Sequence, residues 1–170
     1  MWAHASVIWH RRSPSEARRD GRKFTVPSIG GSILVNLNDA FDAPLQYGGP
    51  AGSEYAQPTA VFIQELTHSW QIHNNSFLGV VCGMDFNYDH FDSRGRIGET
   101  AWLKRRWSTF NNKQQVHIVD DWYGEHVLTD AIGNYLFDAK GLPVTDLDGF
   151  AASNDSAFRF IGNNIRIGVV

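Results

Sequence analysis

The sequence predicts a small α+β domain in which a short sheet packs against two main helices. Two apolar runs, at 24–29 and 33–37, are joined by Gly30-Gly31, and the second alternates as a half-buried strand does. Two longer segments carry helical signals: one runs over 58–74, and the other begins near residue 112. Strands followed by separate helices are typical of the α+β class.

The chain has 170 residues, of which 42% are apolar and 19% charged, and this balance suits one domain with a hydrophobic core. We place that domain at residues 24–170. Residues 1–23 are polar and basic, and we expect a weakly ordered N-terminal arm, with binding of an anionic partner as the alternative. The basic residues of the arm are Arg11, Arg12, Arg18, Arg19, Arg22 and Lys23.

Composition argues against several classes of function. The net charge of −3 and the pI of about 6.1 do not suit a nucleic-acid-binding protein. Cys82 is the single cysteine, which excludes an intrachain disulfide and a cysteine metal cluster. We find neither a membrane-spanning run nor a cleavable signal peptide, so we expect a cytoplasmic protein, or one exported without a cleavable signal, and no membrane partner.

Each predicted helix has a recognisable start. Proline is tolerated in the first turn of a helix, so Pro58 opens the segment that ends near Asn74. Asn111 or Asn112 caps the second helix, which we expect to reach about Tyr123 and at most Phe137. The apolar side of the first helix is Val61, Phe62, Leu66, Ile72 and Trp70, and that of the second is Val116, Val119, Trp122 and Tyr123.

The remaining segments carry weaker signals. Residues 38–57 hold several prolines and glycines and should form a long loop, and residues 77–92 could be a short helix or an irregular strand pair. Residues 93–110 should be a connector. We find no internal repeat in the sequence.

One segment of the first helix carries chemistry. Zinc peptidases use H-E-x-x-H because residues four apart share a helix face, so two imidazoles can bind one ion beside a glutamate base. The same register here is Gln64-Glu65-Leu66-Thr67-His68, with glutamine at the first ligand position. A surface-facing polar stripe is the alternative for Glu65 and His68.

The run F-I-Q-E-L-T-H-S-W-Q at 62–71 resembles the F-I-H-E-L-T-H-x-W-Q segment of small bacterial metallopeptidase-like proteins related to Vgr and Rhs proteins. The run N-N-K-Q-Q-V-H-I-V-D-D-W-Y at 111–123 is similar to a second family segment, N-x-E-Q-Q-A-E-I-V-x-D-Y, and residues 160–166 give a weaker match. This resemblance implies a zincin-like fold and association with contractile injection systems.

The resemblance also implies a set of site residues. A later helix of such proteins supplies a glutamate ligand and, four residues on, an aspartate that orients a ligand histidine. The matching positions are His117 and Asp121. The implied site is Zn²⁺ bound by Gln64, His68 and His117, with Glu65 as general base. It would face a cleft whose wall includes an edge strand at 33–37.

Two functions follow from this site. The first is a zinc-dependent peptidase acting on a peptide or protein substrate, as an effector or processing factor of a secretion system. The second is a catalytically inactive zincin-like module that binds or supports other proteins, because glutamine is a poorer ligand than histidine. On that second view Gln64 is a spectator where a ligand was lost, and His117 is an exposed residue paired with Asp121.

Overall fold

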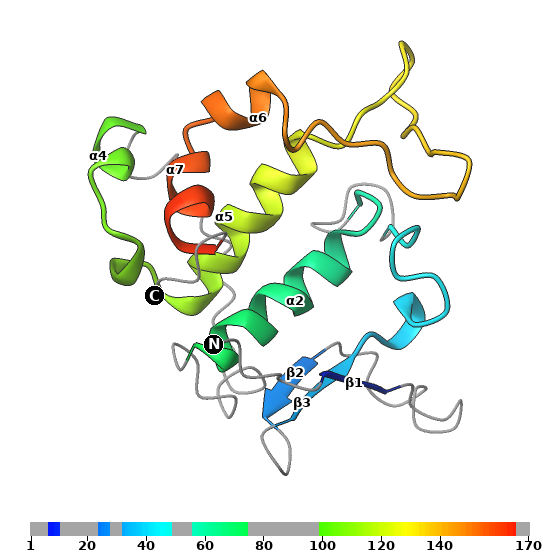
Figure 1. Cartoon of the computed structure of the whole chain (residues 1–170), viewed down its shortest axis with the longest axis horizontal. Coiled ribbons are helices and arrows are strands. Elements are labelled where there is room, and N and C mark those ends of the chain that lie inside the picture. Colours follow the sequence, from blue (N-terminus) through cyan, green and yellow to red (C-terminus); the bar gives the residue numbers. More distant parts are fainter. Residues whose placement is uncertain (1–6, 11–23, 28–31, 49–55, 75–98, 166–170) are drawn as a thin grey trace.

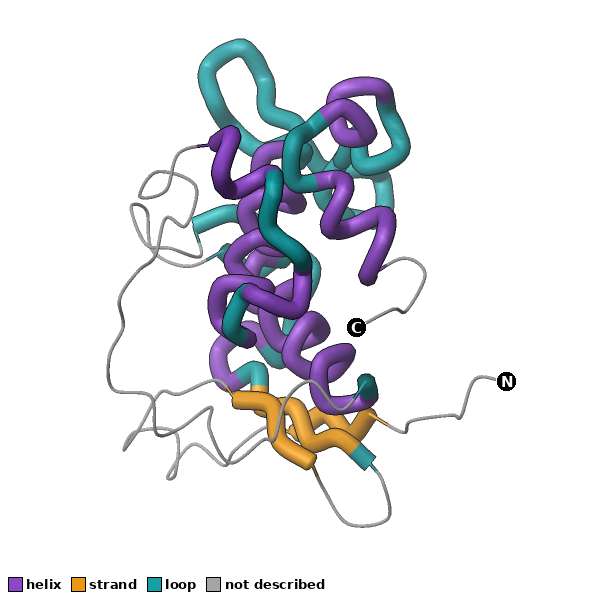
Figure 2. The backbone as a smooth tube through the Cα atoms, turned by 90° about the vertical axis from the view of Figure 1, so that its left-hand side faces the viewer, coloured by secondary structure: helices purple, strands orange, loops and turns teal. Residues whose placement is uncertain are grey.

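A computed structural model describes residues 7–10, 24–27, 32–48, 56–74 and 99–165. The class is α+β, as predicted. A three-stranded sheet lies against helix α2 (Ala60–His73), and helix α5 (Asn112–Glu125) lies beside α2 on the side away from the sheet (Figures 1 and 2). Shorter helices complete the fold at α4 (Glu99–Leu103), α6 (Phe150–Asn154) and α7 (Phe158–Phe160), with single turns at η2 (Asn38–Ala40), η3 (Trp107–Thr109) and η4 (Ile161–Ile165).

The sheet has the strand order β1-β3-β2. β2 (Phe24–Pro27) and β3 (Ile33–Asn36) form the predicted antiparallel pair. β1 (Val7–His10) pairs in parallel with β3, so the expectation of a weakly ordered arm is wrong for these four residues. β3 is the central strand, and the expectation that 33–37 forms a sheet edge is also wrong. The edges of the described sheet are β1 and β2.

α2 begins two residues after the predicted Pro58 and ends where expected. Its N-cap, Thr59, has a φ of 72°, a left-handed conformation that is costly for a β-branched residue. The surrounding contacts hold it there, because the Thr59 hydroxyl donates to the Leu45 carbonyl at 2.6 Å and its N–H donates to the Tyr47 carbonyl at 3.0 Å. At the other end, the Asn74 side chain donates to the Trp70 carbonyl at 2.9 Å.

α5 begins with a capping box. The Asn111 side chain accepts from the Gln114 N–H at 2.9 Å, and the Gln114 side chain accepts from the Asn111 N–H at 3.1 Å. The helix ends at Glu125, so an extension to Phe137 is wrong. Beyond it, residues 127–145 form three isolated β-bridges instead of a helix.

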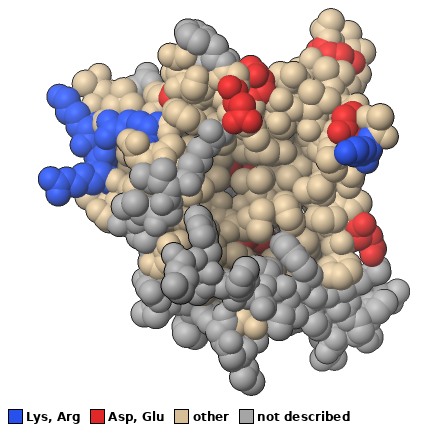
Figure 3. Space-filling view, viewed as in Figure 1, with Lys and Arg blue, Asp and Glu red and all other residues tan. Residues whose placement is uncertain are grey.

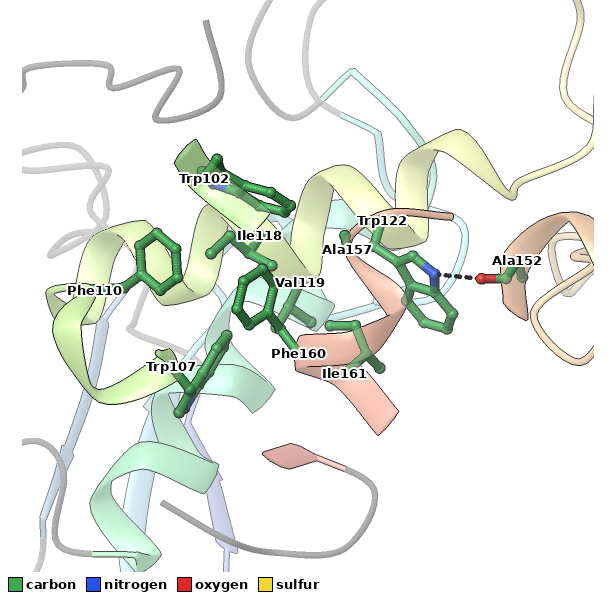
Figure 4. Close-up of a cluster of buried hydrophobic side chains, with 10 residues drawn as sticks. All are labelled: Trp102, Trp107, Phe110, Ile118, Val119, Trp122, Ala152, Ala157, Phe160 and Ile161. Atoms are coloured by element: carbon green, nitrogen blue, oxygen red, sulfur yellow. Dashed lines mark hydrogen bonds between the residues drawn. The ribbon is translucent and has the colours of Figure 1, made fainter. Parts of the chain in front are cut away.

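The main core lies between α5 and the C-terminal helices (Figure 4). Phe160 is central, since its ring packs edge-on against Trp102 at 4.8 Å and Phe110 at 5.2 Å between centroids. The Trp122 indole N–H donates to the Ala152 carbonyl at 3.3 Å and so ties α5 to α6. The predicted buried residues of α5 are confirmed as buried: Val116, Val119, Trp122 and Tyr123.

A second apolar cluster joins the sheet to α2, and α2 therefore contributes to both cores. Its buried members are Ile33, Val35, Leu37, Ala40 and Val61. On the other side of the helix, Ile63 and Trp70 pack against the main core. Within the described residues, no helix is both long enough and apolar enough to cross a membrane. The predictions for 77–92 and for Cys82 lie outside the described residues.

Candidate functional site on helices α2 and α5

The five predicted site residues lie on the two long helices. Glu65 and His68 on α2 are buried, with 3% and 6% of their surface exposed, and Gln64 is half-buried. On α5, His117 is half-buried and Asp121 is exposed. The surface-stripe alternative for Glu65 and His68 is therefore wrong. α2 buries polar residues because the sheet covers one side and α5 covers another.

The buried hydroxyls of α2 are satisfied within the helix. Thr67 Oγ1 donates to the Ile63 carbonyl at 2.8 Å, and Ser69 Oγ donates to the Glu65 carbonyl at 2.9 Å. Such bonds to the preceding turn satisfy a hydroxyl where water is excluded. These bonds reduce the free-energy cost of burying the two hydroxyls. Helix α2 can therefore carry buried polar side chains between the sheet and α5.

The Glu65 carboxyl group is held by the sheet. Thr25 Oγ1, on β2, makes a short hydrogen bond to Glu65 Oε2 and lies 3.3 Å from the Glu65 carbonyl oxygen. Thr25 is itself fully buried. A hydroxyl that donates to a buried carboxylate stabilises its charged form and fixes its orientation.

The His68 ring is held by Gln71. Gln71 Nε2 lies 2.9 Å from the Asn112 carbonyl oxygen, which can only accept, so the atom on that side must be the amide nitrogen. The amide oxygen then faces His68 Nδ1 at 3.0 Å. Nδ1 must therefore carry the proton, and the neutral ring has its lone pair on Nε2. This is the tautomer in which Nε2 can bind a metal ion.

The hydrogen bonds that position His68 extend to α5. Gln71 Nε2 also donates to Gln115 Oε1 at 2.9 Å. Gln115 Nε2 in turn lies 3.3 Å from the Trp107 carbonyl oxygen and 3.4 Å from that of Phe110. His68 is thus connected through two buried amides to the loop that precedes α5. Each amide has its donor and acceptor used, so the arrangement specifies one orientation.

Burial lowers the pKa of His68 below its usual 6.5, because desolvation disfavours the imidazolium form. The hydrogen bond with Gln71 raises the pKa in opposition, and the positive charge of Lys113 lowers it further. The net direction is downward, so the ring is neutral at pH 7. A neutral imidazole is the form that binds a metal.

Two contacts set the register of the antiparallel pair α2 and α5. Gln71 meets Gln115 near one end, and Thr59 is hydrogen-bonded to Tyr123 near the other. From these two contacts and the rise per helical residue, we infer that His68 lies at about the height of the α5 turn that contains His117. Gln64 then lies at about the height of the following turn, which contains Asp120 and Asp121.

Asp120 is a buried carboxyl group that the sequence analysis did not single out. It has 8% of its surface exposed, whereas the predicted Asp121 is exposed. The pKa of Tyr123 is raised, mainly by burial and further by the negative charge of Asp120, while its hydrogen bond with Thr59 acts in the opposite direction.

The donors suit a divalent ion only if Gln64 takes part. Among the described residues, no three His, Cys, Asp or Glu side chains form a group that could hold a metal. The set Gln64, His68 and His117 contains two imidazoles and one amide. Imidazole nitrogens suit zinc, and an amide oxygen is a weaker third donor, so the chemistry of these donors would suit a weakly held ion.

Sequence reasoning missed the residues that hold Glu65 and His68. Gln71 follows His68 by three positions, which places both on one helix face, and this spacing was the available signal. Thr25 and Gln115 lie 40 and 44 residues away from their partners, and no local pattern connects them. Comparison of the chain with protein-family models, curated proteins and solved structures finds no match.

Proposed function

We propose that this protein is a zincin-like domain that hydrolyses peptide bonds. It would bind a divalent metal ion, Zn²⁺ by preference, through His68, His117 and Gln64. The observation that carries the proposal is the state of His68. The ring is buried and neutral, and Gln71 fixes the proton on Nδ1 so that Nε2 bears the lone pair.

The arrangement of the helices supports the same proposal. The two interhelical contacts put His117 at about the height of His68, and Gln64 lies one turn before His68 on α2. These positions are the ones that the motif Q-E-x-x-H and the resemblance to the metallopeptidase-like family assign to ligands. Asp121 would orient a ligand from the next turn of α5, although its exposure makes that contribution weaker.

Each residue has a distinct role in the proposed reaction. A bound zinc ion would lower the pKa of a water molecule and polarise the scissile carbonyl group. Glu65 accepts a proton from water and passes it to the leaving amine. Thr25 holds the Glu65 carboxyl group in one orientation, and Gln71 does the same for the His68 ring.

The proposed substrate is a peptide or protein segment in an extended conformation. Such a segment could add to a sheet edge by main-chain hydrogen bonds, and the edges of the described sheet are β1 and β2. β2 carries Thr25, which contacts Glu65, so an addition at this side would lie near the proposed base. A role beside an injection system rests on the sequence resemblance.

The second candidate is a module with the same architecture that binds without catalysis. The burial of Glu65 favours it, since 3% exposure and a short hydrogen bond to Thr25 commit this carboxyl group to the interior. The weak third ligand at Gln64 favours it as well. In this case the metal and the proton transfer are both lost, and the helix pair serves as a scaffold.

Metal content separates the two candidates. Protein purified without a histidine tag is dialysed against micromolar zinc and measured by elemental analysis, as are His68→Ala and His117→Ala. His73→Ala is the matched control, because His73 is an exposed histidine of the same helix. Near-stoichiometric zinc that is lost in the first two variants and kept in the control supports the proposed centre.

Zinc retained in His68→Ala, or absent from the native protein, would rule the proposed centre out. If zinc binds as expected, hydrolysis of a mixed peptide library is followed by mass spectrometry, with Glu65→Gln as the inactive comparison. Equal cleavage by this variant would exclude Glu65 as the base. Zinc binding with no cleavage would leave a metal-binding domain without peptidase activity, which neither candidate describes in full.

A further inference from the structure

Residues 126–149 contain a three-fold repeat that is closed by hydrogen bonds. Asp130, Asp138 and Asp146 are eight residues apart, and each is followed three residues later by a glycine. In each unit the glycine N–H donates to the aspartate carbonyl, at 3.1, 2.9 and 3.2 Å. The three glycines are Gly133, Gly141 and Gly149. The sequence analysis found no internal repeat, and this expectation is wrong.

The first two units have the same turn. Asp130 Oδ1 accepts from the N–H groups of Ile132 and Asn134, at 3.0 and 2.9 Å. Asp138 Oδ1 accepts from the equivalent N–H groups of Lys140 and Leu142, both at 2.8 Å. The glycines have φ values of +89° and +74°, which only glycine adopts at little cost.

Three further hydrogen bonds close the units into a ring. Leu136 N–H donates to the Leu128 carbonyl at 3.0 Å, Val144 N–H to the Leu136 carbonyl at 2.9 Å, and Leu128 N–H to the Val144 carbonyl at 2.8 Å. The third unit leads into α6. Its Asp146 N–H donates to the backbone carbonyl of His126 at 3.0 Å, and this bond links the end of the repeat to its start. We call residues 126–149 the ring. These bonds close the ring through its own backbone groups, and further bonds anchor it, since the Gln46 side chain donates to the Gly141 carbonyl at 2.7 Å and the Val127 N–H donates to the Gly124 carbonyl at 3.4 Å.

The ring carries the exposed apolar side chains of the described structure. Ile132 is 85% exposed and Phe137 46%, and Leu128 and Leu136 are 40% and 38% exposed. Elsewhere in the described ranges, no large apolar side chain is classed as exposed. Single exposed apolar residues are common, but four within ten residues on one projecting element indicate a contact surface (Figure 1).

The same surface is acidic. The ring contains Asp130, Asp138, Asp146 and Asp148 against one cation, Lys140, and all five are exposed. In Figure 3 carboxyl groups of the described residues appear along the right-hand side, which includes the ring, and at the top, whereas the visible Lys and Arg atoms of the described residues gather mainly on the left, beside α4. A partner that covers the apolar residues must therefore come close to several negative charges.

We propose that the ring is a docking surface for a basic, apolar segment of another protein. Leucine or isoleucine side chains of the segment would pack on Ile132, Phe137 and Leu136, and lysine or arginine side chains would meet the ring carboxylates. An anionic lipid surface is disfavoured, because the carboxylates repel it. Nucleic acid is disfavoured by the same charge.

The test uses the full chain, labelled with ¹⁵N, and three synthetic peptides of equal length. One alternates lysine with leucine, the second alternates glutamate with leucine, and the third alternates lysine with serine. The lysine–leucine peptide should shift the amide signals of Leu128, Ile132 and Leu136. The other two should bind at least about tenfold more weakly, because each lacks one of the two required features.

Variants locate the binding site. Ile132→Ser and Phe137→Ser should each weaken binding of the lysine–leucine peptide by about three- to tenfold, since each removes one apolar contact. Lys140→Glu should tighten it several-fold, because the Lys140 side chain is exposed and only its backbone N–H supports the turn. Ala101→Ser, at an exposed position of α4, is the matched control and should leave binding unchanged. Circular dichroism checks that each variant is folded.

Four results would overturn the proposal. Equal binding of the glutamate–leucine peptide, or binding that both serine variants leave unchanged, would show that the ring does not select a basic apolar segment. A dimer in light scattering that Ile132→Ser dissociates would assign the surface to a second copy of this chain. Binding to phosphatidylcholine–phosphatidylglycerol vesicles that the same variant abolishes would assign it to membranes.

Discussion

Gln71 and Gln115 meet across the interface of α2 and α5, where Gln71 Nε2 donates to Gln115 Oε1 at 2.9 Å. The contact lies between the proposed ligand His68 and the carbonyl groups of Trp107 and Phe110. The contact contributes to the register of the helix pair, while the Asn112 carbonyl orients Gln71, which sets the tautomer of His68. A change at Gln71 should alter stability and the imidazole together, and a change at Gln115 should alter mainly stability.

Gln71→Leu tests this connection directly. The substitution leaves the Asn112 carbonyl and the Gln115 amide oxygen without their donor, which should reduce the free energy of unfolding by about 1–3 kcal/mol. It also removes the acceptor for His68 Nδ1–H. Urea denaturation measures the first effect, and ¹⁵N spectra of the histidine rings measure the second.

Gln115→Leu is the control for Gln71→Leu, because it removes an amide that does not contact His68. It breaks the chain one step further from His68, so a stability loss of the same order should come with an Nδ1–H tautomer that is largely kept. An unchanged His68 spectrum in Gln71→Leu would contradict the assignment of the tautomer to Gln71.

Thr25→Val should destabilise the protein because it removes the hydroxyl that donates to Glu65 Oε2. Hydrogen bonds to charged groups contribute about 1.5–3 kcal/mol, and valine has nearly the same shape as threonine. The free energy of unfolding is measured for Thr25→Val, Glu65→Leu and the double variant, since leucine has no acceptor for the Thr25 hydroxyl. A coupling energy near zero in this cycle would show that the Thr25–Glu65 contact contributes nothing.

The stability of the protein should fall as the pH is lowered from about 6.5. Burial holds the pKa of His68 below 6.5 in the folded state, so the unfolded chain binds the proton more readily. The stabilisation is complete above the unfolded pKa and is lost progressively toward the lower folded pKa. Denaturation of the native protein and of His68→Asn between pH 5 and 7.5 should show a smaller slope in the variant.

Gly133→Ala and Gly141→Ala should destabilise the ring by similar amounts, about 1 kcal/mol each, because both positions have left-handed φ values. At Gly133 an added Cβ meets nothing within 4 Å, and at Gly141 the nearest atom is the flexible Gln46 side chain at 3.6 Å. The cost is therefore conformational in both. Thermal unfolding measures it, and a stabilising alanine at either position would contradict this account of the turns.

Local patterns in the sequence determined the main elements. Apolar alternation predicted β3, and the capping residues around Asn111 predicted the start of α5. These signals act within a few residues, so they can be recognised without the fold. The α+β class followed from their order along the chain.

Only the tertiary structure decided the surroundings of the site. Glu65 and His68 could have formed an exposed stripe, and they are buried because the sheet and α5 cover α2 on two sides. Thr25 reaches Glu65 from 40 residues away along the chain, and Gln115 reaches Gln71, the residue that holds His68, from 44 residues away. The three units of the ring have in common only one aspartate and one glycine per eight residues. The repeat is recognised from the equivalent hydrogen bonds of the units. Burial and long-range hydrogen bonding depend on which elements meet, and a single chain's local pattern does not specify that.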